Sequence, residues 1–164
     1  MSLDPGRVAV LRAAYDEALR TARNLRSSVR RLSGTLLPVA SGSLERLGED
    51  DRDRLDAFRV RFMELQDLLG AKIFRALLIV EQEKPGSQLD VLNRMEKRGV
   101  ITSVQAWSAL RDLRNSLSHD YPASDAERGA ALNEALVQTS ALLGVLDTVR
   151  GYCAANLGLD LPEP

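Results

Sequence analysis

Apolar residues recur at alternating three- and four-residue steps through most of this 164-residue sequence, and that spacing is what most restricts the fold. The longest example lies between residues 51 and 83, at Leu55, Phe58, Phe62, Leu65, Leu69, Ile73, Ala76 and Val80. Side chains three and four positions apart share one face of an α-helix, so the spacing predicts a long helix with one apolar stripe. Because such a stripe must be covered, we expect the helix to pack in a bundle.

Four more helices are predicted by the same periodicity and by residues typical of helix ends. They are expected from about Gly6 to Leu32, Leu89 to Arg98, Ser103 to His119 or Asp120, and Asp125 to Asn156. The third and fourth of these are preceded by the capping-box patterns Thr102-Ser103-Val104-Gln105 and Ser124-Asp125-Ala126-Glu127. With aromatic residues at only 4%, the sequence favours an all-α, up-and-down bundle of about five helices packed by aliphatic side chains.

Glycine and proline divide the sequence without separating domains. Residues 33–50 lose the helical periodicity and are predicted to form a loop or an active-site flap, and residues 157–164 a C-terminal tail. The length suits one domain with a single core, so residues 1–164 are taken as one unit. Gly70 lies inside the second helix, where it predicts a kink or a close approach of another helix.

The net charge of −1 excludes a uniformly basic nucleic-acid binder but leaves room for a local basic surface. Of the 22 basic residues, all but three are arginines, and seven of them fall within residues 1–35. Four form a stripe on the first predicted helix: Arg12, Arg23, Arg26 and Arg30. This stripe is suited to a phosphate backbone, and equally to a solvated helix face.

Cys153 is the only cysteine, which excludes an internal disulfide and fits a reducing cytoplasm. Its place in a helical pattern predicts a buried thiol. The sequence has no run of 18 apolar residues and no hydrophobic signal segment at its start. We therefore expect a cytoplasmic protein without a membrane-spanning segment.

The residues best suited to chemistry lie together between Arg111 and Pro122, a stretch that holds the only histidine. His119 can transfer protons near neutral pH, and Arg114 has a planar guanidinium that matches a phosphate. Asn115 adds a hydrogen-bond donor and an acceptor. The alternative is that these cations only stabilise the C-terminal end of a helix.

Arg114 and His119 are five positions apart, which places them about 140° apart on an unbroken helix. Pro122 disfavours a helical conformation at Tyr121, so the helix is expected to end near His119 or Asp120. The long arginine side chain can then curl around the helix edge. Alternatively, copies of these residues from two subunits meet across a symmetric interface.

The string Arg114-Asn115-x-x-x-His119-x-Tyr121 resembles the R-[N/polar]-x-x-x-H signature of the HEPN domain. Its added H-x-Y looks like the variant found in the ribonuclease toxins of HEPN/MNT toxin-antitoxin pairs. HEPN domains are helical bundles, so the motif and the predicted fold agree.

The resemblance implies a metal-independent endoribonuclease that works without a cofactor, as a homodimer, by attack of the ribose 2′-OH on the adjacent phosphate. His119 would move the proton, Arg114 would stabilise the transition-state charge and Asn115 would position them. Arg111 is a further candidate for substrate binding. In similar toxins a partner nucleotidyltransferase attaches AMP to the tyrosine of H-x-Y, here Tyr121, and the added charge and bulk would block RNA.

Two other interpretations remain open. The chain is either a non-catalytic HEPN-like subunit or antitoxin-type partner that binds a nucleotidyltransferase, or a helical interaction domain in which the motif is coincidental. Tyr121 then simply packs beside Pro122. Trp107, in the helix that carries the motif, is expected to belong to the core.

Overall fold

The structure, a computed structural model, describes residues 2–118 and 123–164. Its helices are α1 (Pro5–Leu32), η1 (Leu44–Arg46), α2 (Glu49–Asp67), η2 (Leu68–Ile73), α3 (Phe74–Val80), α4 (Gln88–Lys97), α5 (Val104–Ser116), α6 (Asp125–Tyr152) and η3 (Cys153–Leu157). Here η1 is a 3-10 helix, and η2 and η3 are π-helical. The described residues form no β-strand, so the predicted all-α class is confirmed.

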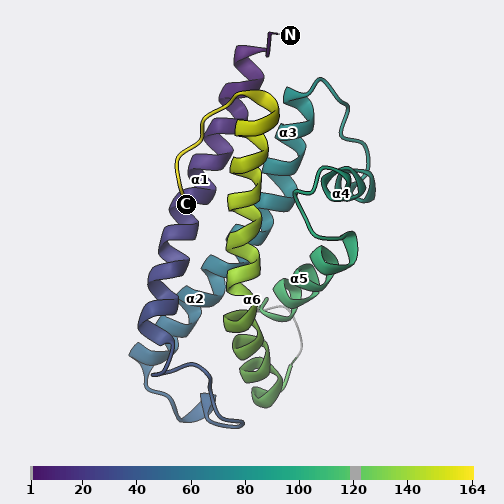
Figure 1. Ribbon diagram of the computed structural model, residues 1–164. Helices are drawn as coiled ribbons and strands as arrows, with labels where there is room; N and C mark the ends of the chain where they lie inside the picture. Colours follow the sequence, from purple (N-terminus) through teal and green to yellow (C-terminus); the bar gives the residue numbers. More distant parts are fainter. Residues whose placement is uncertain (1, 119–122) are drawn as a thin grey trace.

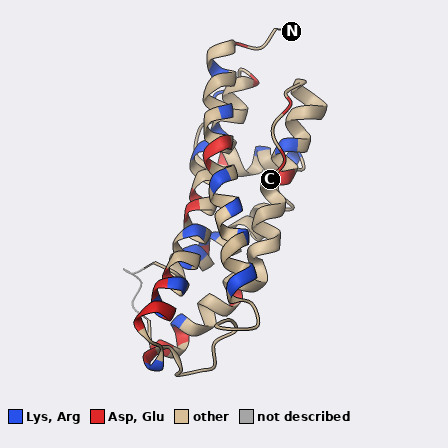
Figure 2. Cartoon of the chain, turned by 90° about the vertical axis from the view of Figure 1, so that its left-hand side faces the viewer, with Lys and Arg blue, Asp and Glu red and all other residues tan. Residues whose placement is uncertain are grey.

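Three long rods make up the bundle (Figure 1). α1 runs down the molecule, the continuous rod of α2, η2 and α3 runs back up, and α6 runs up beside them. In the sequence, α4 and α5 follow the second rod and lead the chain down again to the start of α6. This gives the predicted up-and-down order. Positive and negative side chains are interspersed along the chain (Figure 2). The five predicted helical runs are all present, the second being divided locally by η2.

The second rod changes from α- to π-helical hydrogen bonding around Gly70, at the place where α5 approaches it closely. Gly70 is buried, and a Cβ atom at this position would lie 3.2 Å from the Trp107 ring of α5. Trp107 is also packed against Phe74, with 4.9 Å between ring centroids. The close approach predicted from Gly70 is therefore confirmed, and so is the core position of Trp107.

The helix that carries the motif begins within one residue of its predicted start, but its capping contacts and its C-terminal end differ from the prediction. It begins after Ser103, whose side chain accepts a hydrogen bond from the Ala106 amide, and the Val104 amide donates to Glu96 of α4. Thr102 and Gln105 therefore do not form the predicted capping box. The helix ends at Ser116, earlier than the predicted His119 or Asp120. Just beyond its end, the Leu117 carbonyl accepts a hydrogen bond from Arg59 of α2.

The connection between α1 and α2 is tied down. The Asn133 side chain of α6 accepts from the Val39 amide at 2.7 Å and donates to the Val39 carbonyl at 2.9 Å. Leu37 and Val39 are buried in the core. The segment predicted as a loop or flap is thus a loop whose middle is fixed to α6.

Residues 158–164 pack back along α1 (Figure 1). The Tyr15 hydroxyl donates to the Pro162 carbonyl at 2.7 Å, and Arg12 donates to the Asp160 carbonyl at 2.7 Å. Arg23 reaches the Glu163 carbonyl at 3.5 Å. Two of the four arginines in the predicted basic stripe therefore hold the chain's own C-terminal segment.

α6 and η3 together form the most apolar helix of the bundle. Among the described residues, only the helical run 125–157 is long and apolar enough to cross a membrane. This is weak evidence for a membrane span, because buried core helices satisfy the same criteria. Gly158, in the left-handed conformation with a φ of 63°, caps the end of the run. Cys153 is fully buried, as expected from its helical context, and burial raises the pKa of its thiol to about 11.

Candidate functional site

The last turn of α5 presents Arg114 and Asn115, the two motif residues that the structure describes. The Arg114 guanidinium donates from Nε to Asp67 Oδ1 at 2.9 Å and from Nη2 to Asp67 Oδ2 at 2.7 Å. A carboxylate of α2 thus binds one edge of the guanidinium through two hydrogen bonds. Asn115 is exposed, and its side chain has no partner among the described residues. Arg111 is exposed on the same helix.

Asp67 fixes the direction of Arg114 without using all of its donors. An arginine has five N–H groups, and the pair with Asp67 uses two of them. The hydrogen bond and charge of Asp67 outweigh partial burial and raise the pKa of Arg114 above its ordinary value. The arginine is therefore a permanent cation with donors to spare, in a fixed orientation.

His119 and Tyr121, predicted as the catalytic base or acid and as the modification site, lie outside the described residues. The structure consequently places Arg114 and Asn115 on the last turn of α5 and leaves their geometry toward His119 undescribed. Within residues 2–118 and 123–164, no three side chains of the His, Cys, Asp or Glu types are grouped to hold a metal ion.

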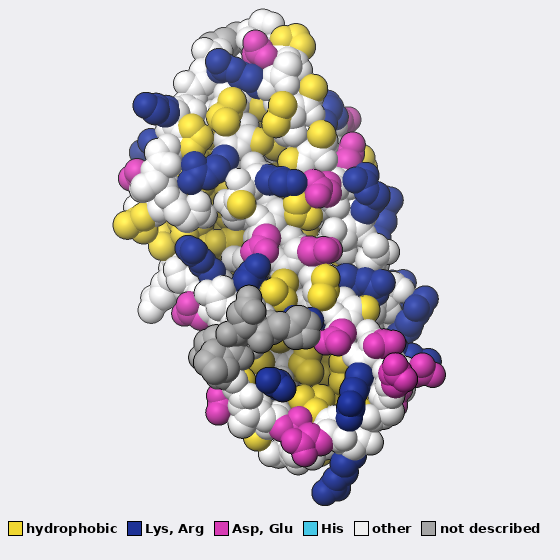
Figure 3. All heavy atoms as spheres, turned by 180° about the vertical axis from the view of Figure 1, so that it is seen from behind, with side chains coloured by type: hydrophobic (Ala, Val, Ile, Leu, Met, Phe, Trp, Pro, Cys, Tyr) yellow, Lys and Arg dark blue, Asp and Glu magenta, His cyan; other side chains and the backbone are white. Residues whose placement is uncertain are grey.

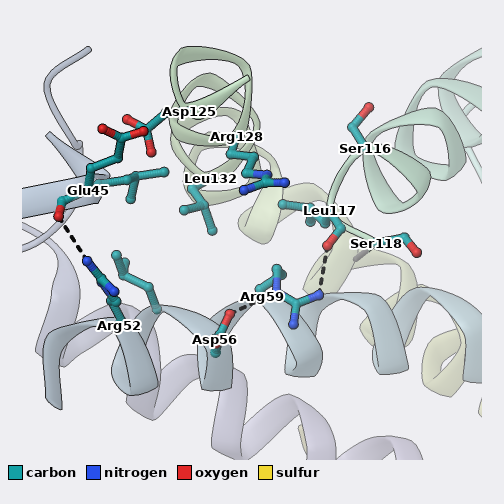
Figure 4. A pocket seen from close by; sticks show the side chains of 12 residues that line it. Glu45, Arg52, Asp56, Arg59, Ser116, Leu117, Ser118, Asp125, Arg128 and Leu132 are labelled. Atoms are coloured by element: carbon teal, nitrogen blue, oxygen red, sulfur yellow. Dashed lines mark hydrogen bonds and ion pairs between the residues drawn. The ribbon is translucent and has the colours of Figure 1, made fainter. Parts of the chain in front are cut away.

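A pocket of about 400 Å³ lies beside the end of α5. Its walls come from four parts of the chain: η1, α2, residues 116–118 and the start of α6 (Figure 4). Leucines supply its apolar surface, and the space-filling view shows a hollow with a hydrophobic floor and charged side chains around it (Figure 3). Ser118, which directly precedes His119 in the sequence, belongs to the lining.

Two of the three arginines that line the pocket are held by protein groups. Arg52 donates to the Glu45 carbonyl at 2.9 Å, which joins α2 to η1. Arg59 pairs with Asp56 at 3.2 Å and donates to the Leu117 carbonyl at 2.8 Å, which joins α2 to the end of α5. These contacts build the pocket walls.

The third arginine, Arg128, extends from α6 into the pocket (Figure 4). Its guanidinium, on an exposed side chain, has no hydrogen-bond or ion-pair partner among the residues that the structure describes. Arg128 also lies in the first turns of α6, where the helix dipole disfavours a cation. This combination distinguishes Arg128 from the arginines that maintain the fold.

Asp125, the first residue of α6, contributes a second unsatisfied group to the same lining. Its Oδ2 atom is buried without a hydrogen-bond partner, and it is the only such side-chain atom in the described chain. Buried acceptors are usually satisfied, since leaving one without a donor costs free energy. The Asp125 carboxylate therefore stands at the pocket lining without a protein donor for its buried oxygen.

The sequence pattern did not identify the pocket residues, because they lie far apart between Leu44 and Leu132. Asp125 was placed at a helix start, where acids are favourable for the dipole alone. One available signal was Arg128, a cation in the first turns of a predicted helix.

Asp67 was missed as well, because nothing in the sequence relates it to Arg114, 47 positions away. Comparisons with protein-family models, with curated proteins and with solved structures each found no match for this chain, so the site is defined by its own residues.

Proposed function

We propose that this chain is a metal-independent endoribonuclease toxin of the HEPN/MNT type, cleaving RNA by attack of a ribose 2′-OH on the adjacent phosphate. Arg114 stabilises the charge that develops on the phosphate, and His119 transfers the proton of the 2′-OH or of the leaving oxygen. Asn115 positions these groups, and Arg111 contributes to binding of the substrate.

The observation that carries this proposal is the orientation of Arg114 by Asp67. Electrostatic catalysis requires a charge that is already in place, so that no reorganisation is needed as the transition state forms. The pair with Asp67 supplies this preorganisation and leaves three of the five N–H donors for a phosphate. The pocket beside Ser118 supplies room for RNA next to the motif.

The same proposal includes regulation and assembly. The active form is a cytoplasmic homodimer that does not use a membrane, and a partner nucleotidyltransferase adds AMP to Tyr121. The transferred phosphate brings negative charge and bulk to the H-x-Y segment, which repels RNA.

One observation favours the non-catalytic alternative. Asp67 already pairs with Arg114 through two hydrogen bonds, and such an ion pair is also what a structural arginine makes. In this alternative the chain binds a nucleotidyltransferase as an inactive subunit, and Asp67 withholds Arg114 from RNA.

The test compares RNA cleavage and growth arrest for wild type, Arg114→Ala, His119→Ala and Asp67→Asn. Arg20→Ala is the control, since Arg20 is exposed on α1 and makes no described side-chain contact. All variants are checked for folding by circular dichroism. We expect His119→Ala and Arg114→Ala to abolish cleavage, Asp67→Asn to reduce it, and Arg20→Ala to leave it unchanged.

Asp67→Asn separates the two functions. Reduced cleavage means that the carboxylate orients a working arginine. Cleavage that appears only when Asp67 is replaced means that the carboxylate restrains Arg114, and equal inactivity of all folded proteins leaves the non-catalytic partner as the function.

A further inference from the structure

Asp125 and Arg128 are one helical turn apart, and yet they do not pair. Three other Asp–Arg pairs with this spacing inside described helices are within ion-pair distance: Asp51–Arg54 at 3.8 Å, Asp56–Arg59 at 3.2 Å and Asp147–Arg150 at 3.6 Å. The spacing thus normally produces a contact in this protein. At the pocket, the acid and the base stay separate and each lacks a partner among the described residues.

The two unpaired groups are suited to a ligand that carries both hydrogen-bond donors and a negatively charged group. Asp125 brings to the pocket lining a carboxylate that has no protein partner among the described residues, and carboxylates accept from N–H or O–H donors, whereas Arg128 has donors suited to an anion. The lining of the same pocket also includes an apolar surface from Leu44, Leu55 and Leu132. A flat, apolar body with N–H donors at one end and a negative charge at the other meets all three conditions.

A nucleotide of single-stranded RNA has this chemistry, because its unstacked base exposes an edge with N–H donors while its phosphate carries the charge. Guanine has two adjacent N–H donors on its Watson–Crick edge, which match a carboxylate. The pocket volume of about 400 Å³ lies within the range of roughly 300–1,000 Å³ that small-molecule sites occupy.

The pocket is also close enough to the motif to serve the same RNA. Arg59, in the pocket, and Asp67, at Arg114, are eight residues apart on α2, or about 12 Å along the helix. At about 3.4 Å per stacked nucleotide, a few nucleotides cover this distance.

We propose that this pocket binds a guanine nucleotide of the RNA substrate, with the base edge on Asp125 and a phosphate on Arg128. In this way the pocket selects the position at which the RNA is cut. The assignment rests on the proposed function for its link to cleavage, whereas binding at the pocket is independent of Arg114 and His119.

The experiment measures binding of fluorescent 2′-O-methyl RNA hexamers, which lack the 2′-OH nucleophile and stay uncut. One hexamer contains a single guanine in a uridine background, and others carry adenine or cytosine at that position. Wild type is compared with Asp125→Asn and Arg128→Gln. Asp53→Asn and Arg20→Gln are matched controls, because both residues are exposed and neither side chain makes a described contact.

We expect wild type to bind the guanine hexamer about tenfold more tightly than the others, and Asp125→Asn to lose that preference. Arg128→Gln should weaken all hexamers alike and reduce the slope of log affinity against log salt by about 0.7, the value for one phosphate contact on a single strand. The two controls should behave as wild type, and circular dichroism should show all proteins folded.

Three results overturn the proposal: no preference for guanine, an Asp125→Asn protein that keeps the preference, or Arg128→Gln with an unchanged salt slope. Free guanosine monophosphate that binds as tightly as the hexamer assigns the pocket to a mononucleotide and also overturns the RNA assignment. If guanine binding holds while no RNA is cleaved, the pocket stands and the ribonuclease function fails.

Discussion

At the end of the bundle where α3 and α6 finish, Glu81 accepts hydrogen bonds from both Arg98 and Tyr152, while at the opposite end Asp125 and Arg128 stay unpaired. Arg98 and Glu81 expose only 15% and 14% of their side chains, so their charges are partly desolvated and need one another. The Asp125 Oδ2 atom is likewise removed from water but has no donor. The charges at the first end pair with one another and stabilise the fold. Those at the second end have no described protein partner, and we propose that they bind a ligand.

The electrostatics of the paired end follow from its contacts. Burial disfavours the charged form of Arg98 and by itself would lower its pKa. The charges of Glu81 and Glu83 and the hydrogen bond to Glu81 outweigh this effect and raise the pKa above the ordinary value. Burial, followed by the hydrogen bond to Glu81, raises the pKa of Tyr152. Both groups therefore keep their protons in the folded protein.

The largest effect should come from breaking the paired end. Glu81→Ala leaves Arg98 and Tyr152 without their shared acceptor, and we expect the free energy of unfolding to fall by about 3 kcal/mol. Glu64→Ala, at an exposed residue of α2 without a described side-chain contact, should change it by less than about 0.5 kcal/mol. Urea unfolding measures both, and equal effects would mean that Glu81 is no more than a surface charge.

The next effect depends on pH. Burial raises the pKa of Tyr15 from 10.0 to about 12. The unfolded chain releases this proton near pH 10 and the folded chain near pH 12, so the contribution is complete below pH 10 and is lost between the two values. The expected loss is about 1.4 kcal/mol per pH unit, or roughly 2 to 3 kcal/mol over the window.

Tyr15→Phe removes that proton while keeping the ring. Its unfolding free energy should fall less steeply than that of wild type between pH 10 and 12, although the hydrogen bond to Pro162 is lost at every pH. Urea titrations at half-unit pH steps measure the two slopes. Parallel curves would show that Tyr15 does not titrate differently in the folded and unfolded chains.

A smaller effect concerns Gly70, where α5 packs on the second rod between the two ends. Gly70→Ala should destabilise the protein by about 1 kcal/mol, because its Cβ would lie 3.2 Å from Trp107. Gly144→Ala is the matched control, since nothing lies within 4 Å of its Cβ and alanine favours a helix there by about 1 kcal/mol. Thermal unfolding should show opposite signs, and a stabilising Gly70→Ala would mean that α5 yields at this contact.

The smallest effect is expected at the pocket. Asp125→Asn and Arg128→Gln should each change the free energy of unfolding by no more than about 0.5 kcal/mol, because neither residue has a described partner to lose. Differential scanning calorimetry without RNA checks this. A loss as large as that for Glu81→Ala would show that the pocket charges are structural and would remove the contrast between the ends.

Much of the fold was predictable because helix boundaries depend on local residues. Asp4 caps α1, and its side chain accepts from the Arg7 amide at 2.9 Å. Ser87 and Asp90 form a capping box at the start of α4, and Ser124 caps α6. The end of α5 differs from its prediction, and just beyond it a side chain of α2 binds the Leu117 carbonyl, a contact that no local pattern contains.

Less of the candidate site was predictable. Arg114 and Asn115 were identified from their types and spacing, but the orientation of Arg114 depends on a carboxylate 47 positions away. The roles of His119 and Tyr121 remain predictions from the motif. Asp125 and Arg128 were not identified, because their lack of partners is a property of side-chain positions.

The sequence by itself determined where the helices lie and which face of each is apolar, because periodicity and caps act over a few neighbouring residues. It also determined that Arg114, Asn115 and His119 share one short segment. Only the tertiary structure decided that Asp67 holds Arg114, and that η1, α2, the end of α5 and the start of α6 enclose a pocket. Those arrangements depend on how distant segments pack, and a local pattern does not contain that information.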